Sequence, residues 1–288
     1  MEKADPKIAL VVCTKNRAGN LDSFFDAIRR LDCNGPWELI VVNGSTDDTD
    51  ERLKAFASTF PGRITVITEL QPGLGLARNR GWRQSTAPIM AFTDDDCYPD
   101  KFFLNDIQAV FADPSLGCAG GRILLYDPTD AMMTINESLE EKFLRAGDFP
   151  PAGFMQGANM AFRRQALVDI NGFDDSLGAG KPFGAEDVDA AVRALAHGWT
   201  AKYDPRPVVY HHHRRKPGND AMQLSRAYYV DRGGYYMKCI LFMPQRWRCI
   251  KFWLWTARHQ ALGITLREVG GAIRYLFYQC GQKPNRSY

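Results

Sequence analysis

The amino-acid sequence predicts an α/β fold: a doubly wound, mostly parallel mixed sheet followed by a helical region at the C-terminal end. Four β-rich apolar runs recur at even spacing within the first 100 residues, and helix-type patterns lie between them. The composition then changes near residue 220. Strands that alternate with helices build βαβ units, which give a parallel sheet with helices on both faces.

The four apolar runs are expected to be the strands of the first half, at residues 8–14, 37–43, 64–68 and 89–93. After the first run, apolar side chains follow the 3.6-residue period of a helix at Leu21, Phe24, Phe25 and Ile28. After the second run they do so at Leu53, Phe56 and Phe60, behind a capping-type Ser-Thr-Asp segment.

The second half is less regular but continues the same domain. Residues 118–126, 158–164 and 208–212 have the pattern of strands, and residues 186–197 that of a helix. We therefore expect a mixed sheet in a domain of residues 1–220, followed by a helical region over residues 221–288. This last region contains 11 Lys and Arg against two acidic residues, and 13 of the 34 aromatic residues.

The overall composition indicates a folded, soluble protein. The 288 residues are 45% hydrophobic and 24% charged, and the net charge of +3 gives no indication of nucleic-acid binding. Seven cysteines without a CxxC pair fit a reducing cytosol. The chain shows neither a signal peptide nor about 18 uninterrupted apolar residues, so we expect a cytoplasmic protein.

Polar residues collect where the strands end, which is where doubly wound sheets bind ligands. Three adjacent carboxylates, Asp94, Asp95 and Asp96, follow the fourth strand. They repel one another, so a divalent cation with oxygen ligands, Mg²⁺ or Mn²⁺, is their natural partner. The alternative is a polar turn that caps the next helix.

Two further clusters can also be interpreted either as functional groups or as ordinary structural features. Glu186 and Asp187 open a helix, where one of them could act as a general base or both could simply complement the helix dipole. His211 and His213 share one face at the end of a strand, where an imidazole could bind the metal. The alternative there is a solvated basic loop.

Neither GxGxxG nor GxxxxGK[ST] follows the first strand, which excludes a dinucleotide fingerprint and a Walker loop. What remains is a nucleotide site that handles phosphates with a metal ion.

At this level of detail the chain resembles the inverting glycosyltransferases of family 2, which have the GT-A fold. The resemblance covers about residues 7–216 and rests on eight motifs in family order: IALVVCTKNR, VVNGSTDDT, GLGLARNRGW, AFTDDDCYPD, GFMQGANMAFRR, GFDDSLGAG, GAEDVD and VVYHHH. It implies a nucleotide-binding half of about residues 1–115 and an acceptor half of about residues 116–220.

The resemblance also implies roles for individual residues. Asp96 would bind Mn²⁺ or Mg²⁺ with His211 or His213, and Asp187, beside Glu186, would deprotonate the acceptor hydroxyl. Gly157 and Asn159 would line the sugar side. The nucleotide of the donor would contact Thr14, Arg17, Asn43, Ser45, Arg78, Asp94 and Asp95.

One departure concerns the nucleobase. Asn43 and Ser45 stand where family members commonly carry an acidic residue that accepts a hydrogen bond from uracil. An Asn amide can still accept and can also donate. A UDP-sugar is the expected donor, with GDP- and dTDP-sugars left open.

The region over residues 221–288 contains no motif of a known chemistry. As a helix, residues 246–263 would place Trp247, Ile250, Leu254 and Ala261 on one side and Arg248, Lys251 and Arg258 on another. Basic and aromatic residues in this mixture suit peripheral contact with the anionic inner face of the cell membrane. The alternative is an appendage packed on the catalytic domain or on a second subunit of an oligomer.

The expected activity is transfer of a sugar to a glycan or lipid-linked glycan in surface polysaccharide synthesis. A sugar nucleotidyltransferase is one rival, although CTKNRAG poorly replaces the Gly-rich loop that such an enzyme needs. A non-catalytic, nucleotide-sugar-binding scaffold subunit is the other.

Overall fold

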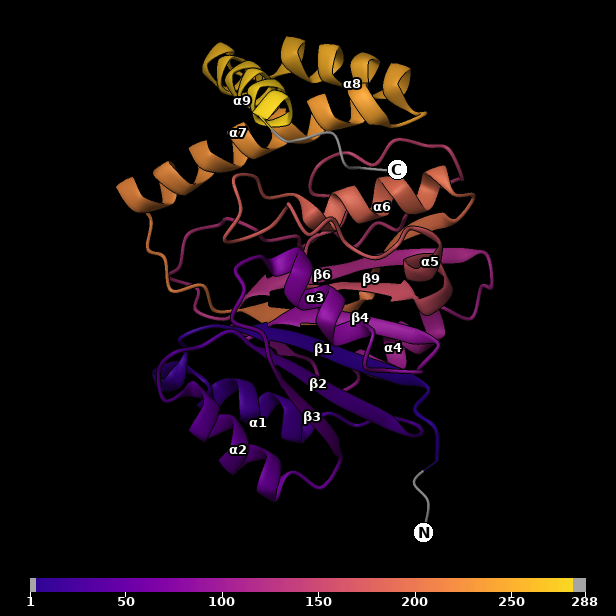
Figure 1. The fold of residues 1–288 in the computed structure, drawn as a ribbon, viewed down its shortest axis with the longest axis vertical. Coiled ribbons are helices and arrows are strands. Elements are labelled where there is room, and N and C mark those ends of the chain that lie inside the picture. Colours follow the sequence, from indigo (N-terminus) through magenta and orange to yellow (C-terminus); the bar gives the residue numbers. More distant parts are fainter. Residues whose placement is uncertain (1–3, 282–288) are drawn as a thin grey trace.

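Figure 1 shows the computed structural model, which describes residues 4–281. One sheet runs through the molecule in the strand order β3-β2-β1-β4-β8-β6-β9-β5, and β7 pairs with β9. The strands are β1 Ile8–Thr14, β2 Trp37–Asn43, β3 Arg63–Thr68, β4 Ile89–Asp94, β5 Cys97–Pro99, β6 Leu116–Leu125, β7 Lys142–Leu144, β8 Met160–Arg163 and β9 Thr200–His211. The expected α/β fold with a doubly wound, mixed sheet is confirmed.

The first four strands are parallel, and their register places the binding edge. Thr14 pairs with Asn43, which in turn pairs with Thr68, and Cys13 pairs with Asp94. The carboxyl ends of these strands therefore lie level with one another, so the loops that follow them meet at one edge of the sheet.

Helices cover both faces of the sheet because alternate residues of each strand are apolar on opposite faces. Ile8, Leu10 and Val12 of β1 belong to one core, with α1 and α2, while Ala9 and Val11 belong to the other. The helices of the first two thirds of the chain are α1 Asp22–Arg30, α2 Thr49–Thr59, α3 Leu74–Trp82, α4 Phe103–Val110, α5 Arg164–Asp169 and α6 Glu186–Ala196, with a 3₁₀ turn at Ala18–Asn20.

The second half makes the sheet mixed. β8 is antiparallel to both β4 and β6, β9 is parallel to β6, and β5 and β7 are antiparallel to β9. We expected a short strand at 208–212, but β9 begins at Thr200. Asp204 and Pro207 interrupt the apolar pattern there, and the β6–β9 ladder accommodates them with a register shift between Gly120 and Arg122.

Three helices follow the sheet, α7 Asn219–Phe242, α8 Arg246–His259 and α9 Leu262–Gly281. The expected helix over 246–263 is wrong at its end, because the backbone turns to an extended conformation at Gln260. Ala261 therefore does not share a face of α8 with Trp247. Residues 282–288 of the expected tail lie outside the described residues.

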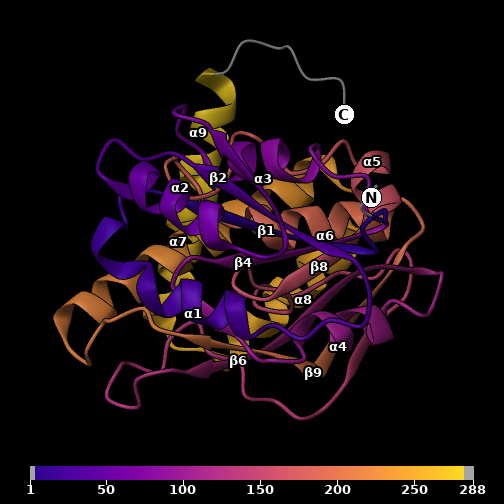
Figure 2. The same ribbon diagram turned by 90° about the horizontal axis from the view of Figure 1, so that it is seen from below.

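The view from below in Figure 2 has the indigo α1 nearest the viewer and the yellow and orange C-terminal helices behind it, so α7, α8 and α9 lie across the molecule from α1 and α2. Between residues 4 and 281, no helix combines the length and apolarity that a membrane crossing requires.

The crossing of α7 and α9 depends on two glycines. A Cβ on Gly233 would lie 1.9 Å from the carbonyl oxygen of Glu268, and one on Gly271 would lie 2.0 Å from the carbonyl oxygen of Val230. Only residues without a side chain allow backbones to approach this closely.

We predict that Gly271→Ala lowers the free energy of unfolding by about 1–3 kcal/mol, because the new methyl group forces the two backbones apart. The neighbouring Gly270 is the matched control. A Cβ at this position would have no atom within 4 Å, so Gly270→Ala should be neutral or stabilising by up to about 1 kcal/mol through helix propensity. Urea unfolding of the two variants measures the difference, and equal stabilities would contradict the predicted close packing.

Candidate active site

The three carboxylates of the sequence Asp94-Asp95-Asp96 lie between β4 and β5, against the loop after β1. The Thr14 hydroxyl donates to Asp95 Oδ2 at 2.6 Å. The Arg17 guanidinium reaches Asp95 Oδ1 at 3.3 Å and Asp96 Oδ2 at 3.2 Å. Two segments about 80 residues apart in the chain thus form one polar cluster.

Burial and charge act in opposite directions on these carboxyl groups. Burial raises the pKa of Asp95 to about 6, although the charge of Arg17 opposes the shift. Burial also raises the pKa of Asp94. For Asp96, burial favours the neutral acid, but contacts with His211 and the charge of Arg17 outweigh it and hold its pKa below the usual range. Asp96 is thus the one of the three carboxyl groups whose surroundings lower its pKa.

His211 lies beside Asp96 because β5 pairs with β9 in a register that sets Cys97 opposite His211. The distance from His211 Nε2 to Asp96 Oδ1 is 3.4 Å, and His211 Nδ1 lies 3.3 Å from the Thr134 hydroxyl. A carboxylate and an imidazole together suit Mn²⁺ or Mg²⁺. The neighbouring Cys97 completes a group of possible ligands, but burial raises its pKa well above the usual value, so it stays a thiol.

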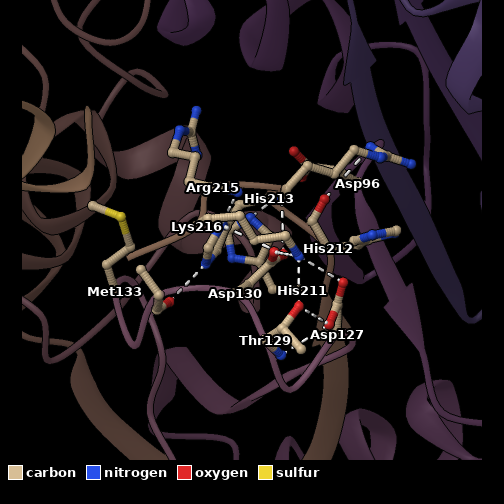
Figure 3. A network of polar contacts seen from close by, with 12 residues as sticks. Asp96, Asp127, Thr129, Asp130, Met133, His211, His212, His213, Arg215 and Lys216 are labelled. Atoms are coloured by element: carbon tan, nitrogen blue, oxygen red, sulfur yellow. Dashed lines mark hydrogen bonds and ion pairs between the residues drawn. The ribbon is translucent and has the colours of Figure 1, made fainter. Parts of the chain in front are cut away.

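His213 is placed differently, although it is two residues away. Its Nε2 lies 2.9 Å from the carbonyl oxygen of Ala131, and its Nδ1 accepts a hydrogen bond from the Arg215 backbone N–H at 3.1 Å. Both ring nitrogens therefore have protein partners. Figure 3 shows the ring within this network, which also includes Asp130.

The same network fixes the segment after β9. The Lys216 ammonium group donates to Asp127 Oδ2 at 2.8 Å, to Asp130 Oδ1 at 2.7 Å and to the Thr129 hydroxyl at 2.7 Å (Figure 3). Asp127, Asp130 and His212 also have metal-ligand spacing. Because the lysine supplies positive charge between the two carboxylates, it links the segment after β9 to residues 127–130.

Arg78, on α3, connects the carboxylates after β4 with the acidic pair on α6. It is buried, and its guanidinium pairs with Glu186 through Nη1 and lies 3.4 Å from Asp94 Oδ1 through Nη2. A Cβ on Gly157 would be 2.2 Å from Arg78 Nη2. Glycine at 157 is therefore required for the guanidinium to occupy this position.

Asp187 and Glu186 open α6 after Ala185, whose φ of 69° turns the chain into the helix. Asp187 Oδ2 accepts a hydrogen bond from the Gly157 backbone N–H at 2.8 Å. Glu186 is buried against Arg78, whereas Asp187 is partly exposed. Burial raises the pKa of Asp187, and burial with the nearby Asp187 charge raises that of Glu186 to about 7, against the opposing charge of Arg78.

Comparison with known proteins accords with this arrangement. Residues 9–170, more than half of the chain, match the family described as Glycosyl transferase family 2. The chain belongs to glycosyl transferase family 2.

Known glycosyltransferases to which the chain is similar are distant relatives. The chain is 28% identical over 217 residues to the pre-mycofactocin glycosyltransferase of Mycobacterium tuberculosis, covering 72% of this chain and 43% of that protein. It is 24% identical to the validoxylamine A glucosyltransferase of Streptomyces hygroscopicus, with 67% and 52% coverage. The chain thus spans about half the length of these relatives.

Solved structures show the same GT-A fold. A mannosyltransferase from Pyrobaculum calidifontis, in complex with GDP-Man and Mn²⁺, superposes with a TM-score of 0.63 at 20% identity, covering 98% of this chain and 77% of that one. Residues 1–349 of TarS from S. aureus, in complex with UDP-GlcNAc, superpose with a TM-score of 0.59 at 14% identity, with 94% and 71% coverage.

Two residues that we expected at the glycosyltransferase site have side chains engaged elsewhere. Asn159 is buried, and its amide NH2 group donates to the carbonyl oxygens of Arg122 and Pro207 at 2.8 and 3.0 Å. Asn43 is also buried, and its amide oxygen accepts from the Ser45 backbone N–H at 3.0 Å. Ser45 itself stays partly exposed, with its hydroxyl accepting from the Asn16 N–H.

Other residues near the site were not expected from the sequence. Asn79, next to Arg78, donates to the Phe173 carbonyl at 2.8 Å and to Asp175 at 2.7 Å, and so holds the loop that leads to α6. Its place in the LARN motif was a usable signal. Thr134, which contacts His211, gave none, because it lies in an irregular segment far from the histidine in sequence.

The raised pKa of Glu186 predicts a pH dependence of stability. A carboxyl group whose pKa rises on folding binds a proton more tightly in the folded state. Its contribution is therefore fully present below its ordinary pKa of 4.5 and is lost as the pH rises through about 7. We expect the free energy of unfolding to fall between these values, and Glu186→Gln to make that fall smaller, at about 1.4 kcal/mol per pKa unit removed.

Urea unfolding across this pH range measures the effect. Glu51→Gln, at an exposed position on α2, is the matched control and should follow the parent protein. If Glu186→Gln shows the same pH dependence as this control, the proton is not held at Glu186.

Proposed function

We propose that the chain is an inverting, metal-dependent glycosyltransferase that moves a sugar from a nucleotide-sugar donor to a hydroxyl group of a glycan or lipid-linked glycan. One observation supports this most directly. The metal-type pair Asp96 and His211 stands two residues along the chain from Asp94, whose carboxylate lies 3.4 Å from the buried Arg78, and Arg78 in turn pairs with Glu186 of the acidic pair on α6. Groups suited to binding a diphosphate and to removing a proton therefore lie on two sides of one site.

The donor nucleotide is proposed to bind along the ends of β1, β2 and β4. Thr14, Arg17 and Asp95 already contact one another there. Ser45 is the partly exposed residue of the loop after β2, whereas the side chain of Asn43 supports that loop from inside. A UDP-sugar is the donor that we favour, with Asp94 facing the ribose.

Asp96 and His211 would hold Mn²⁺ or Mg²⁺, and we leave His213 out of this set because both of its ring nitrogens are engaged. A divalent cation supplies positive charge that stabilises the departing nucleoside diphosphate. Arg17 lies on Asp95 and Asp96, with a partly exposed guanidinium, and can add its charge to the same phosphates.

Asp187 is the residue that we assign as general base. It is the more accessible member of the acidic pair, and the hydrogen bond from Gly157 N–H to Oδ2 orients it. A base with a raised pKa takes a proton more effectively near neutral pH. The acceptor oxygen would attack the anomeric carbon as Asp187 removes its proton, and this single displacement inverts the configuration. Glu186 and Arg78 would position the base.

The chain divides in this proposal as the sequence indicated. About residues 1–115 would bind the donor and about residues 116–220 the acceptor, and the part of the chain after residue 220 would be an appendage, which is helical as far as Gly281. The two relatives are named for different acceptors, pre-mycofactocin and validoxylamine A. Our proposal that this chain acts in the cytoplasmic synthesis of surface polysaccharide therefore rests on the resemblance and on the composition of the chain.

We predict that one nucleoside diphosphate, UDP by preference over GDP, dTDP and CDP, raises the thermal unfolding midpoint only with Mn²⁺ present. At one hundred times the dissociation constant, binding stabilises the folded state by about 2.7 kcal/mol. Asp96→Asn and His211→Ala should each weaken the metal-dependent shift. Glu140→Gln, at an exposed position, is the control. A shift equally large without the metal would contradict metal dependence.

We also predict that Asp187→Asn lowers the rate of sugar transfer by about a hundredfold or more, because the acceptor proton loses its base. Asp187 accepts backbone N–H groups on both oxygens, from Gly157 at 2.8 Å and from Val188 at 2.7 Å. The Asn oxygen keeps one of these two hydrogen bonds, so nucleotide binding in the thermal-shift assay should be retained. Release of nucleoside diphosphate from the donor, measured with a glycan or lipid extract as acceptor, reports the rate. Unchanged release would assign the proton transfer to another group.

A further inference from the structure

We propose that the outer surface of α8 and α9 is a docking face for a membrane that contains anionic lipids. We call this surface the α8–α9 face. It is defined by the exposed cations Lys251 and Arg258, the partly exposed Arg267, and nine exposed apolar residues, Trp247, Leu254, Trp255, Leu262, Leu266, Val269, Ile273, Leu276 and Phe277. This proposal goes beyond the sugar-transfer activity.

The apolar part is a continuous stripe along α9. Its members recur at spacings of three and four residues from Leu262 to Phe277, so they lie along one side of the helix. The opposite side, at Glu268, Gly271, Ala272 and Tyr275, is buried. One side of α9 therefore packs on α7, and the other presents apolar side chains to the surface from Leu262 to Phe277.

The exposure of these side chains is large. Phe277 is 75% exposed, Leu262 73% and Trp247 70%. Soluble proteins scatter single apolar residues over their surface, but a stripe of exposed apolar side chains along one side of a helix indicates an interaction site.

The charges on this face decide which partner it fits. Between residues 246 and 281 the single acidic residue is Glu268, which is buried and paired with Arg232. The exposed charges are consequently all positive. Lys251 lies one helical turn from both Trp247 and Trp255, so cations and large aromatic side chains alternate along α8.

This combination matches the interface of an anionic bilayer. Lipid headgroups attract Lys and Arg, tryptophan prefers the boundary between headgroups and acyl chains, and an amphipathic helix buries its apolar side there while lying parallel to the surface. A second copy that docked through the same face would bring the same positive charges, because no acidic side chain is exposed on α8 or α9. A different protein would need acidic side chains of its own to bind there.

The position of the face fits a peripheral contact. α8 and α9 lie on the outer side of α7, with α1 and α2 at the far end of the molecule (Figure 1). Docking through this surface leaves the carboxyl ends of β1, β2 and β4 uncovered.

Co-sedimentation of the full chain with sucrose-loaded vesicles tests the proposal without any donor sugar, so the result is independent of the activity. We expect binding to phosphatidylcholine vesicles that contain about 30% phosphatidylglycerol, little binding to phosphatidylcholine alone, and loss of binding as salt screens the charges.

Two double variants separate the contributions. Lys251→Glu with Arg258→Glu should reduce the partition coefficient on anionic vesicles by roughly tenfold or more, since each basic residue contributes through the surface potential. Arg30→Glu with Arg83→Glu makes the same change of charge at exposed positions elsewhere and should bind like the parent. Leu266→Gln with Phe277→Gln should also reduce binding, whereas Leu70→Gln with Leu139→Gln, equally exposed, should not.

Each of three results would overturn the proposal. One is equal binding to neutral and anionic vesicles, and another is unchanged sedimentation of both α8–α9 variants. The third is a dimer in solution that Leu266→Gln with Phe277→Gln dissociates while the parent does not bind vesicles, which would show that a second copy covers this face.

Discussion

The candidate site depends on one buried guanidinium. Arg78 lies between two acidic residues. One is Asp94, at the end of a central strand, and the other is Glu186, at the start of a helix and 108 residues after Arg78 in the chain. Removing a charge from water is costly unless partners surround it, and loss of one member of a buried pair typically costs about 3–5 kcal/mol. The ion pairs therefore fix α6 against the sheet, and Gly157 must lack a side chain so that they can form.

Around this guanidinium the protein gathers more carboxylates than it neutralises. Arg17 and Arg78 face Asp94, Asp95, Asp96, Glu186 and Asp187, and burial raises the pKa of four of these five acids. Such crowding opposes folding, so the rigid sheet and the two apolar cores must hold it in place. The site is thus suited to added positive charge beside Asp94, Asp95 and Asp96 and to a proton at Glu186 or Asp187.

The sequence predicts those parts in which local pattern and tertiary structure agree. Strands at 8–14 and 37–43 appear with the expected bounds, because short runs of consecutive apolar residues are typical of strands that are buried on both faces. The start of β9 is missed because Asp204 and Pro207 interrupt its apolar pattern. The strand still forms, because its pairing with β6 shifts register at this point. His211 and His213 are equivalent by period, and their tertiary contacts distinguish them: His211 lies beside Asp96, whereas the ring nitrogens of His213 contact Ala131 and Arg215. Asn159 matches a motif, yet its amide serves the backbone of β6 and β9.

The helices after residue 220 are integral to this arrangement rather than loosely attached to it. Lys238 of α7 is buried, and its ammonium lies 2.8 Å from Asp174 Oδ2 and 2.5 Å from Asp189 Oδ1. Asp189 belongs to the same helix as the proposed base, and Asp174 lies in the loop that Asn79 supports from α3. Because an uncompensated buried charge is so unfavourable, α7 cannot leave α6 without exposing all three groups to water together. The buried ion pairs of Lys238 therefore tie α7 to α6, the helix that carries Asp187.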